Sequence, residues 1–457
     1  MKMIEMDQKK LSTSFEENIS YIEQVLPVKT SFDILRRNME IGGRKAIFYF
    51  IDGFTKDDTM TKLMESMSKI KETDMPETGT QFSEKYIPYA EVDVIGNFDK
   101  VFRNLLSGVP ILVIEKYSVC FAIDCRTYPA RSVDEPSKDK SIRGSRDGFV
   151  ETIVFNTALI RRRIRDPHLV MEMTEAGQVT RTDIAICYMA DRVDQQMLKH
   201  IKKEIQQLKI DDLRMNQQSL ANALYKKKWM NPFPKFKYTE RPDTAAACLL
   251  EGKLVILVDN SPSAMILPTS VFDMIEEAND YYFPTITALY LKISRMLITV
   301  ATIFLTPVYL LFMQNLQWVP GIFDFSIVHE VVNVPLVVQY LILEIAIDGM
   351  RLAALNTPNV LSTPLSVIAG LVMGEFAVSS GWFNSEVMLG MAIVAVANYT
   401  QPNFELGYAL KFMRLLLLVL TALFNVVGFV VGCVIVTMMI VFNKTLTGRN
   451  YLKVRLK

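Results

Sequence analysis

The stretch MLITVATIFLTPVYLLFMQ, residues 296–314, decides the class of fold. It contains no charged residue, and a helix of about 20 apolar residues is long enough to cross the hydrocarbon core of a bilayer. Lys292 and Arg295 precede the stretch and Trp318 follows it. Basic residues before a span and an aromatic residue after it are typical of a helix that starts at the cytoplasmic face. The sequence therefore predicts an integral membrane protein.

Four more apolar stretches follow, at 331–347, 364–381, 387–400 and 415–442. The polar N-terminus lacks the apolar core of a secretory signal, and the C-terminal tail is rich in Lys and Arg, which indicates that both ends are cytoplasmic. Two cytoplasmic ends need an even number of crossings. We therefore predict four spans and one short re-entrant or interfacial helix, formed by the second or the fourth of the five stretches.

Charge is distributed unevenly along the chain. It has 50 Lys and Arg and 49 Asp and Glu, but only 10 of these residues lie between Met296 and Phe442. The net charge of +1 gives no reason to expect nucleic acid as a partner, because phosphate binding needs concentrated positive charge. The three histidines are far apart and no close C-x-x-C pair occurs, so we expect no metal and no cofactor. The sequence contains no phosphate-binding glycine loop and no nucleophile elbow, so we expect no enzyme activity.

The region before the apolar stretches has the pattern of a duplicated α/β fold. AIFYFIDGF, residues 46–54, is a short apolar run that ends at Asp-Gly, which predicts a buried strand meeting a turn. It aligns without gaps on AICYMADRV, residues 185–193, and the Leu-Leu-Ser-Gly at 105–108 corresponds to the Leu-Leu-Glu-Gly at 249–252. Chance similarity of short apolar strands is the alternative. Because two features recur in the same order and at nearly the same offset along the chain, we favour an internal duplication. The predicted fold is two tandem cytoplasmic α/β subdomains followed by a multi-helix transmembrane domain.

The predicted organisation is a polar N-terminal segment (1–30), a first α/β subdomain (31–130), a linker and basic helix (131–166), a second α/β subdomain (167–270), an amphipathic connector (271–295), a transmembrane domain (296–443) and a basic cytoplasmic tail (444–457). The basic helix carries Arg161, Arg162, Arg163 and Arg165 at its C-terminal end, where cations complement the helix dipole. These arginines could bind anionic lipid headgroups or an acidic partner surface. The alternative is a solvated helix end with local salt bridges.

The third apolar stretch, PLSVIAGLVMGEFAVSSG, combines an acidic residue with small residues at helical spacing. A carboxylate that faces lipid costs several kcal/mol, so Glu375 should face a wet cavity, a partner or a pore, or else stay protonated and hydrogen-bonded to a neighbouring helix. Small faces let helices approach closely, either in a packed anchor or in a ring of identical helices around a pore. The candidates for pore-lining or gating roles are Ser366, Gly370, Gly374, Glu375, Ser379 and Glu344.

Three long motifs resemble one known family: RGSRDGFVETIVFNTALIRRRIRDPHL, TERPDTAAACLLEGKLVILVDNSPSAMILP and LNTPNVLSTPLSVIAGLVMGEFAVSSGWFNSEVML. They are similar, in order and spacing, to the A subunits of GerA-type spore germination receptors, and the similarity runs over nearly the whole chain. Nutrient-receptor A subunits have an R-G-P-R-E-G-F pattern. Ser145 and Asp147 depart from it and resemble the stage V sporulation branch of the family.

The resemblance implies a multi-pass protein of the spore inner membrane that acts in germination. It further implies a homo-oligomeric ring that forms a cation channel and promotes or amplifies ion release, together with a permease-like B-type membrane subunit as partner. The pore region of the family matches the third apolar stretch. The resemblance also suggests oligomer or interdomain contacts at Arg143, Arg146, Arg161, Arg162, Arg163 and Arg165. The competing function is a non-conducting membrane-anchored scaffold for other germination proteins.

Overall fold

The computed structural model describes residues 9–128, 144–208, 210–225, 231–322, 327–328, 332, 334–356, 367, 370, 372–446, 448 and 450–452. The chain divides into two compact units. We call them the N-terminal unit (Met1–Lys227 with Phe236–Pro268) and the helical unit (Lys228–Lys235 with Thr269–Lys457).

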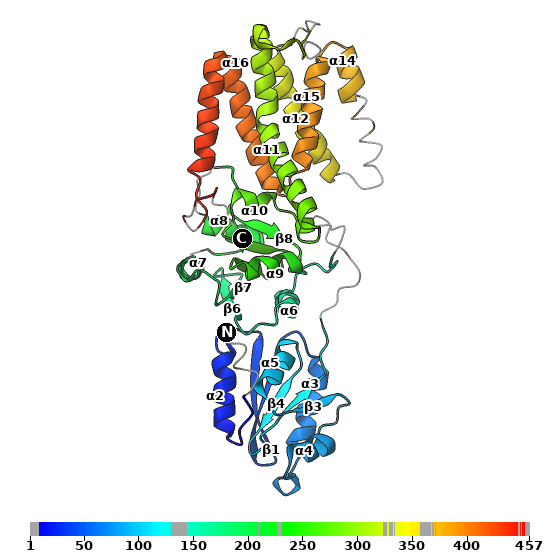
Figure 1. Cartoon of the computed structure of the whole chain (residues 1–457), viewed down its shortest axis with the longest axis vertical. Coiled ribbons are helices and arrows are strands. Elements are labelled where there is room, and N and C mark those ends of the chain that lie inside the picture. Colours follow the sequence, from blue (N-terminus) through cyan, green and yellow to red (C-terminus); the bar gives the residue numbers. More distant parts are fainter. Residues whose placement is uncertain are drawn as a thin grey trace. The chain divides into compact units, whose positions relative to one another are not determined.

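Two subdomains build the N-terminal unit (Figure 1). The elements of the first are α2 (Phe15–Val25), β1 (Ile34–Ile41), β2 (Arg44–Ile51), α3 (Asp57–Ser68), α4 (Gly79–Tyr86), β3 (Val92–Ile95), α5 (Phe98–Leu106), β4 (Ile111–Ile114) and β5 (Cys120–Ile123). Those of the second are α6 (Ile153–Arg163), β6 (Leu169–Ala176), β7 (Thr182–Met189), α7 (Gln195–Gln206), α8 (Asn216–Leu224), β8 (Lys237–Thr239), α9 (Pro242–Leu250), β9 (Leu254–Val258) and β10 (Ala264–Leu267).

The two subdomains repeat one topology. Their antiparallel sheets have the orders β1-β2-β4-β5-β3 and β6-β7-β9-β10-β8, which are the same order shifted by five strands. The matching helices α5 and α9 are both followed by a glycine in the left-handed region, Gly108 at φ +97° and Gly252 at φ +80°, as expected for a helix C-terminus. The predicted pair of tandem α/β subdomains is therefore confirmed.

Helices cover both faces of the first sheet. Along β2, Ile47 and Tyr49 belong to the core under α2 and α5, whereas Ala46 and Phe48 belong to the core under α3 and α4. Successive side chains of a strand point to opposite faces. A strand with two covered faces therefore needs apolar residues at every position, which explains the continuous apolar run in the sequence.

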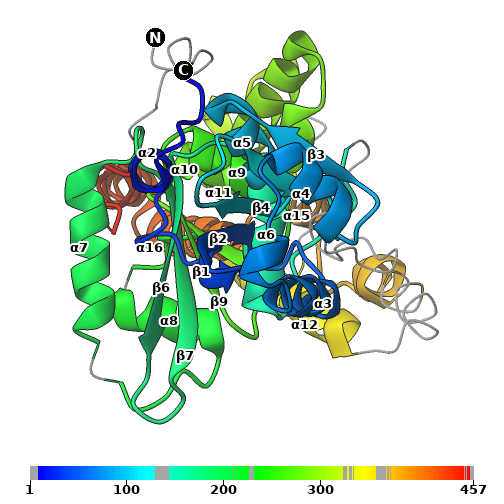
Figure 2. The same ribbon diagram turned by 90° about the horizontal axis from the view of Figure 1, so that it is seen from below.

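The second sheet is covered in the same way. Ala185 and Cys187 of β7 pack in a core with α6 and α9, while the intervening Ile184 and Ile186 are buried on the other face. Figure 2 shows α7 beside β6 on this second sheet, and α7 buries Met197, Leu198, Ile201 and Ile205.

The helical unit contains α10 (Val271–Ile275), α11 (Thr285–Gln314), α12 (Leu336–Asn356), a π-helical turn (Val372–Phe376) that runs into α14 (Ala377–Ser379), α15 (Ser385–Tyr399) and α16 (Phe404–Val441). Helix α11 packs against α15 and α16, and α12 packs against the same two helices (Figure 1). A core of Leu310, Tyr340, Leu343, Val387, Met391 and Leu418 joins them. Within the described residues, α11 and α16 are long and apolar enough to cross a membrane, by length and composition.

The structure differs from the sequence prediction at α16. The apolar pattern predicts one long segment over 415–442, but α16 reverses direction at Asn425, whose backbone has φ 50° and ψ −129°. A Cβ atom built on Gly432 would lie 2.8 Å from Cδ2 of Leu417. Residues this far apart in a straight helix would be separated by about 22 Å. Helix α16 is thus a hairpin with arms 404–424 and 426–441, and glycine lets the arms approach closely.

An amide pair holds the turn of this hairpin. Nδ2 of Asn315, at the end of α11, donates to Oδ1 of Asn425 at 2.6 Å, and Nδ2 of Asn425 donates back to Oδ1 of Asn315 at 3.3 Å. Asparagine adopts positive φ more readily than most residues. Hydropathy does not reveal such a turn, because one polar residue hardly changes the average over the stretch. A second difference is that α11 begins at Thr285, before the predicted span 296–314.

Candidate functional site

The described part of the third apolar stretch presents an open face at Gly370 and Gly374. A Cβ atom built on Gly370 or on Gly374 would meet no described atom within 4 Å, and the side chain of Glu375 is exposed. Glu375 lies in the π-helical turn Val372–Phe376, and π-helical turns occur frequently at functional sites. Ser379 is exposed, and its hydroxyl donates to the carbonyl of Phe376 at 3.2 Å. Ser366 lies outside the described residues.

The surroundings of Glu344 are very different from those of Glu375. Glu344 on α12 is buried, and its Oε1 accepts hydrogen bonds from Nε and Nη2 of Arg414 at 2.7 Å and 2.5 Å. Lys411 lies 3.3 Å from Oε2 of Glu344 and also donates to Asp348. We call Glu344, Asp348, Lys411 and Arg414 the charge quartet. It contains two acidic and two basic side chains, so its formal charge cancels within the chain.

The charge quartet joins three helices. Glu344 and Asp348 come from α12, Lys411 and Arg414 come from α16, and Nη1 of Arg414 donates to the carbonyl of Thr302 on α11 at 3.1 Å. Charge pairs interact strongly in a medium of low dielectric, and each of these groups would be costly to bury alone. The structure therefore places Glu344 in helix packing, while Glu375 is the acidic candidate on an open surface.

Sequence reasoning named Glu344 but missed its partners. Lys411 and Arg414 lie just before the last apolar stretch, and their separation of three residues places them on one helix face. Glu344 and Asp348 share a face in the same way, at a separation of four. One helix therefore carries two acidic residues on a face and another carries two basic residues on a face. This pattern is the signal that could have predicted the contact.

The arginine candidates differ in how far their side chains are exposed. Arg146, Arg162 and Arg165 are exposed, and Cζ of Arg162 lies 4.4 Å from the ring centroid of Tyr128. Arg143 lies outside the described residues. The exposed members keep both interpretations open, a contact surface or a solvated helix end.

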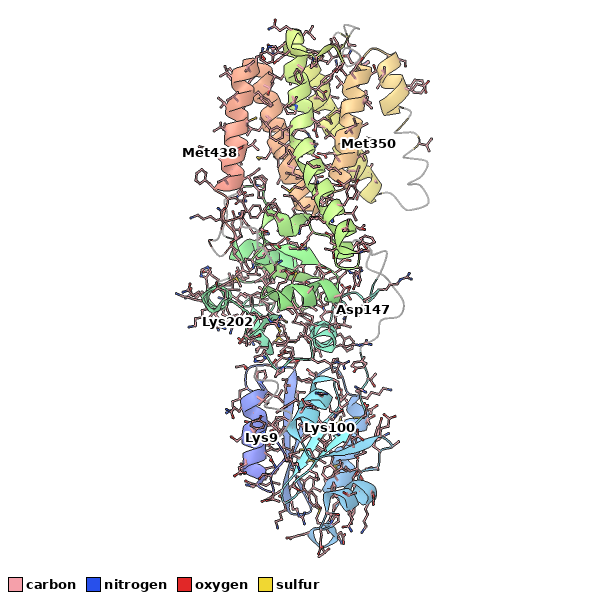
Figure 3. The ribbon with its side chains drawn as sticks, viewed as in Figure 1. Lys9, Lys100, Asp147, Lys202, Met350 and Met438 are labelled. Atoms are coloured by element: carbon pink, nitrogen blue, oxygen red, sulfur yellow. The ribbon has the colours of Figure 1, made fainter. Side chains whose placement is uncertain are left out.

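Arg163 pairs with the residues that depart from the receptor pattern. Its Nη2 donates to both carboxylate oxygens of Asp147 at 2.6 Å and to Oγ of Ser145 at 2.9 Å (Asp147 is labelled in Figure 3). Partial burial raises the pKa of Asp147, but the hydrogen bonds from Arg163 and Ser145 lower it by more, so that the pKa lies below its ordinary value.

Replacing Asp147 by Asn is expected to lower the free energy of unfolding of the N-terminal unit by about 1–2 kcal/mol at pH 7, since the pair is charged and partly exposed. A lowered pKa stabilises the fold above the unfolded-state pKa, and this contribution disappears as the pH falls through the folded-state pKa. Thermal unfolding of the detergent-solubilised chain at pH 7 and pH 3 measures the effect. Asp212→Asn, next to the exposed Arg214, is the matched control. An Asp147→Asn deficit of equal size at both pH values would contradict the assignment.

Arg161 joins the two subdomains. Its guanidinium is fully buried and donates from Nε to Oδ2 of Asp33 at 2.7 Å and from Nη2 to Oδ1 at 3.1 Å. Nη2 also donates to the carbonyl of Leu169 at 3.0 Å. Asp33 precedes β1 of the first subdomain, and Leu169 begins β6 of the second. The backbone adds to the contact, because the amide of Phe32 donates to the carbonyl of Met171 at 2.9 Å.

The family model described as Bacillus/Clostridium GerA spore germination protein matches residues 20–456. The chain therefore belongs to the GerA family of spore germination proteins, and the resemblance in the three sequence motifs is confirmed. It is 34% identical over 417 residues to stage V sporulation protein AF of Bacillus subtilis (strain 168), which covers 91% of this chain and 84% of that protein.

Germination proteins of Bacillus subtilis (strain 168) are also similar. Spore germination protein KA is 27% identical over 431 residues, which covers 93% of this chain and 78% of that protein. Spore germination protein B1 is 28% identical over 378 residues, covering 81% and 77%. Among solved structures, the N-terminal domain of the A subunit of the Bacillus megaterium spore germinant receptor GerK3 is 25% identical, with a TM-score of 0.44, and covers 57% of this chain and 96% of that domain.

Proposed function

We propose that this chain is a subunit of a homo-oligomeric channel for monovalent cations in the spore inner membrane, where it promotes or amplifies ion release during germination. The observation that carries the proposal is the open face of the third stretch, with Glu375 exposed beside Gly370 and Gly374. An acidic group on an apolar helix favours a wet cavity over lipid. Identical faces from several copies would surround such a cavity.

The charge quartet supports the same proposal by contrast. Its carboxylates are neutralised within the chain by Lys411 and Arg414, so they need no ion and no water. Glu375 has no ion pair with any described residue, which leaves its charge available to a passing cation. Rings of Asp or Glu are a common device for cation selectivity in channels.

In this proposal the helical unit is the membrane domain. Helices α11, α12 and α15, the third stretch and the two arms of α16 would all take part. The hairpin at Asn425 makes the number of these segments even. Both ends of the chain can then be cytoplasmic without a re-entrant helix. A permease-like B-type subunit is the proposed partner, and catalysis forms no part of the proposal because the relatives are named as sporulation and germination proteins.

Flux from potassium-loaded vesicles tests the proposal, with the B-type partner present. Glu375→Gln is expected to lower potassium flux about tenfold at low ionic strength and by less at high salt, because a ring of charge concentrates cations near the pore. Glu386→Gln, which removes a carboxylate from the start of α15, is the matched control and should retain the flux.

Oligomer size is measured on the same samples by native mass spectrometry. A channel predicts oligomers for both variants, and Gly374→Leu should alter conductance or gating by adding bulk to the open face. Vesicles that stay tight with the wild-type protein would contradict conduction and favour the scaffold instead. Wild-type flux from both Glu375→Gln and Gly374→Leu would contradict an ion path along the third stretch.

A further inference from the structure

Arg351 is a buried cation without a carboxylate partner among the described residues. It follows Met350 on α12 (labelled in Figure 3), and only 7% of it is exposed. Its Nε is buried and has no hydrogen-bond partner within the described part of the chain. Two other buried cations of the helical unit differ: Arg295 bonds to Glu277 and Asp280, and Arg414 bonds to Glu344.

Three aromatic rings surround the guanidinium. Its Cζ lies 4.9 Å from the ring centroid of Tyr399, 5.2 Å from that of Phe404 and 5.5 Å from that of Tyr408. We call Arg351 and these three residues the aromatic cage. Ring faces attract a cation, but they do not replace the in-plane acceptors that guanidinium N–H groups prefer. The guanidinium also forms hydrogen bonds with the hydroxyls of Tyr399 and Tyr408, whereas Nε has no partner among the described residues. The cage therefore holds a positive charge in place and leaves this one donor unused.

The aromatic cage forms where the ends of three helices meet. Tyr399 is the last residue of α15, Phe404 is the first of α16, and Arg351 lies near the end of α12. The intervening loop carries Gln401, whose Nε2 donates to Oγ1 of Thr299 on α11 at 2.9 Å. Thr299 is one turn after Arg295. The basic residues Lys292 and Arg295 precede the apolar part of α11, which indicates the cytoplasmic face of the membrane. With the helical unit in the membrane as proposed above, the cage would lie at the cytoplasmic end of the helices, near the lipid headgroups.

The outer wall of the aromatic cage suits a lipid. Tyr399 is 62% exposed and Phe404 is 57% exposed, so both rings present apolar surface at this end of the helices. Tyrosine and tryptophan concentrate at membrane interfaces because one part of the ring is apolar and another is polar. A planar guanidinium matches the oxygens of a phosphate group, to which it can donate two parallel hydrogen bonds.

We propose that the aromatic cage binds the phosphate group of an anionic phospholipid of the cytoplasmic leaflet, with Arg351 as the phosphate ligand and Tyr399 and Phe404 against the glycerol and upper acyl chain. The site rests on the proposed membrane placement of the helical unit, but not on conduction. Free phosphate offers the same chemistry to Arg351, and a carboxylate from a second copy offers a similar one. The experiment separates these sources.

Full-length protein in neutral detergent is examined by native mass spectrometry with added phosphatidylglycerol or phosphatidylcholine. The wild type is expected to retain phosphatidylglycerol preferentially, and Arg351→Met to bind it at least about tenfold more weakly, as expected for loss of a charged ligand pair. Lys444→Met is the matched control, since it removes an exposed cation from the same unit. Arg351→Lys keeps the charge without the planar fork, and should bind more weakly even if Arg351→Met fails to fold.

Three results would overturn the proposal. The first is unchanged phosphatidylglycerol retention in Arg351→Met and Arg351→Lys, which would mean that the rings alone satisfy the guanidinium. The second is full displacement of the lipid by millimolar inorganic phosphate, which would identify a free anion as the ligand. The third is loss of the oligomer in Arg351→Met with lipid retention intact, which would identify a contact between copies. Potassium flux is a separate readout, so absent flux with intact lipid binding would contradict only the channel.

Discussion

Replacing Arg161 by Met is expected to lower the free energy of unfolding of the N-terminal unit by about 3–5 kcal/mol. The substitution keeps most of the side-chain volume but removes the cation, and leaves the fully buried carboxylate of Asp33 without its ion-pair partner. It also removes the donor to the carbonyl of Leu169. A buried charge that loses its partner destabilises a fold far more than the intact pair stabilises it.

Hydrogen exchange measured on the full-length chain locates this effect. The amide of Phe32 donates to Met171 O, and the amide of Met171 donates to Oγ of Ser31, so both amides report on the contact between the subdomains. Their exchange should accelerate by about two to three orders of magnitude in Arg161→Met. Arg162→Met changes the neighbouring exposed arginine and should alter exchange little. Equal protection in wild type and Arg161→Met would refute a stabilising role for the Arg161–Asp33 pair.

Replacing Glu344 by Gln is expected to destabilise the helical unit by about 3–5 kcal/mol, because Arg414 then stays buried without its counter-charge. Arg414 is 1% exposed and cannot reach water without a change in packing. Thermal unfolding in detergent, with loss of helical signal as the readout, measures the difference. Glu375→Gln, which affects an exposed carboxylate, should change the unfolding temperature little and is the matched control.

A double variant separates pairing from packing. Glu344→Gln with Arg414→Met removes one charge of each sign and leaves Asp348 with Lys411, so the remaining formal charge still cancels. We expect it to lose less than half of the stability that Glu344→Gln alone loses, because no unpaired charge remains. A double variant that is as unstable as the sum of the single variants would show that the two charges are not coupled.

Predictions from the sequence were most successful where structure depends on neighbours in the chain. The buried strand within 46–54 and its repeat within 185–193 both appear in the structure, since strand patterns and turns depend on a few adjacent residues. The GerA family was likewise recognisable from contiguous motifs, and the family model confirms it. The candidate Glu375 remains a prediction, to which the structure adds an exposed position in a π-helical turn.

The sequence by itself determined the tandem α/β subdomains, the apolar character of the C-terminal region and the family, because each is written in local periodicity or in continuous motifs. Only the tertiary structure decided which charges neutralise one another. Arg161 and Asp33 are 128 residues apart and Arg414 and Glu344 are 70 apart, and no local pattern specifies pairs at such separations. The reversal at Asn425 belongs to the same class, because the close approach of the two α16 arms, together with the amide pair with Asn315, holds that turn.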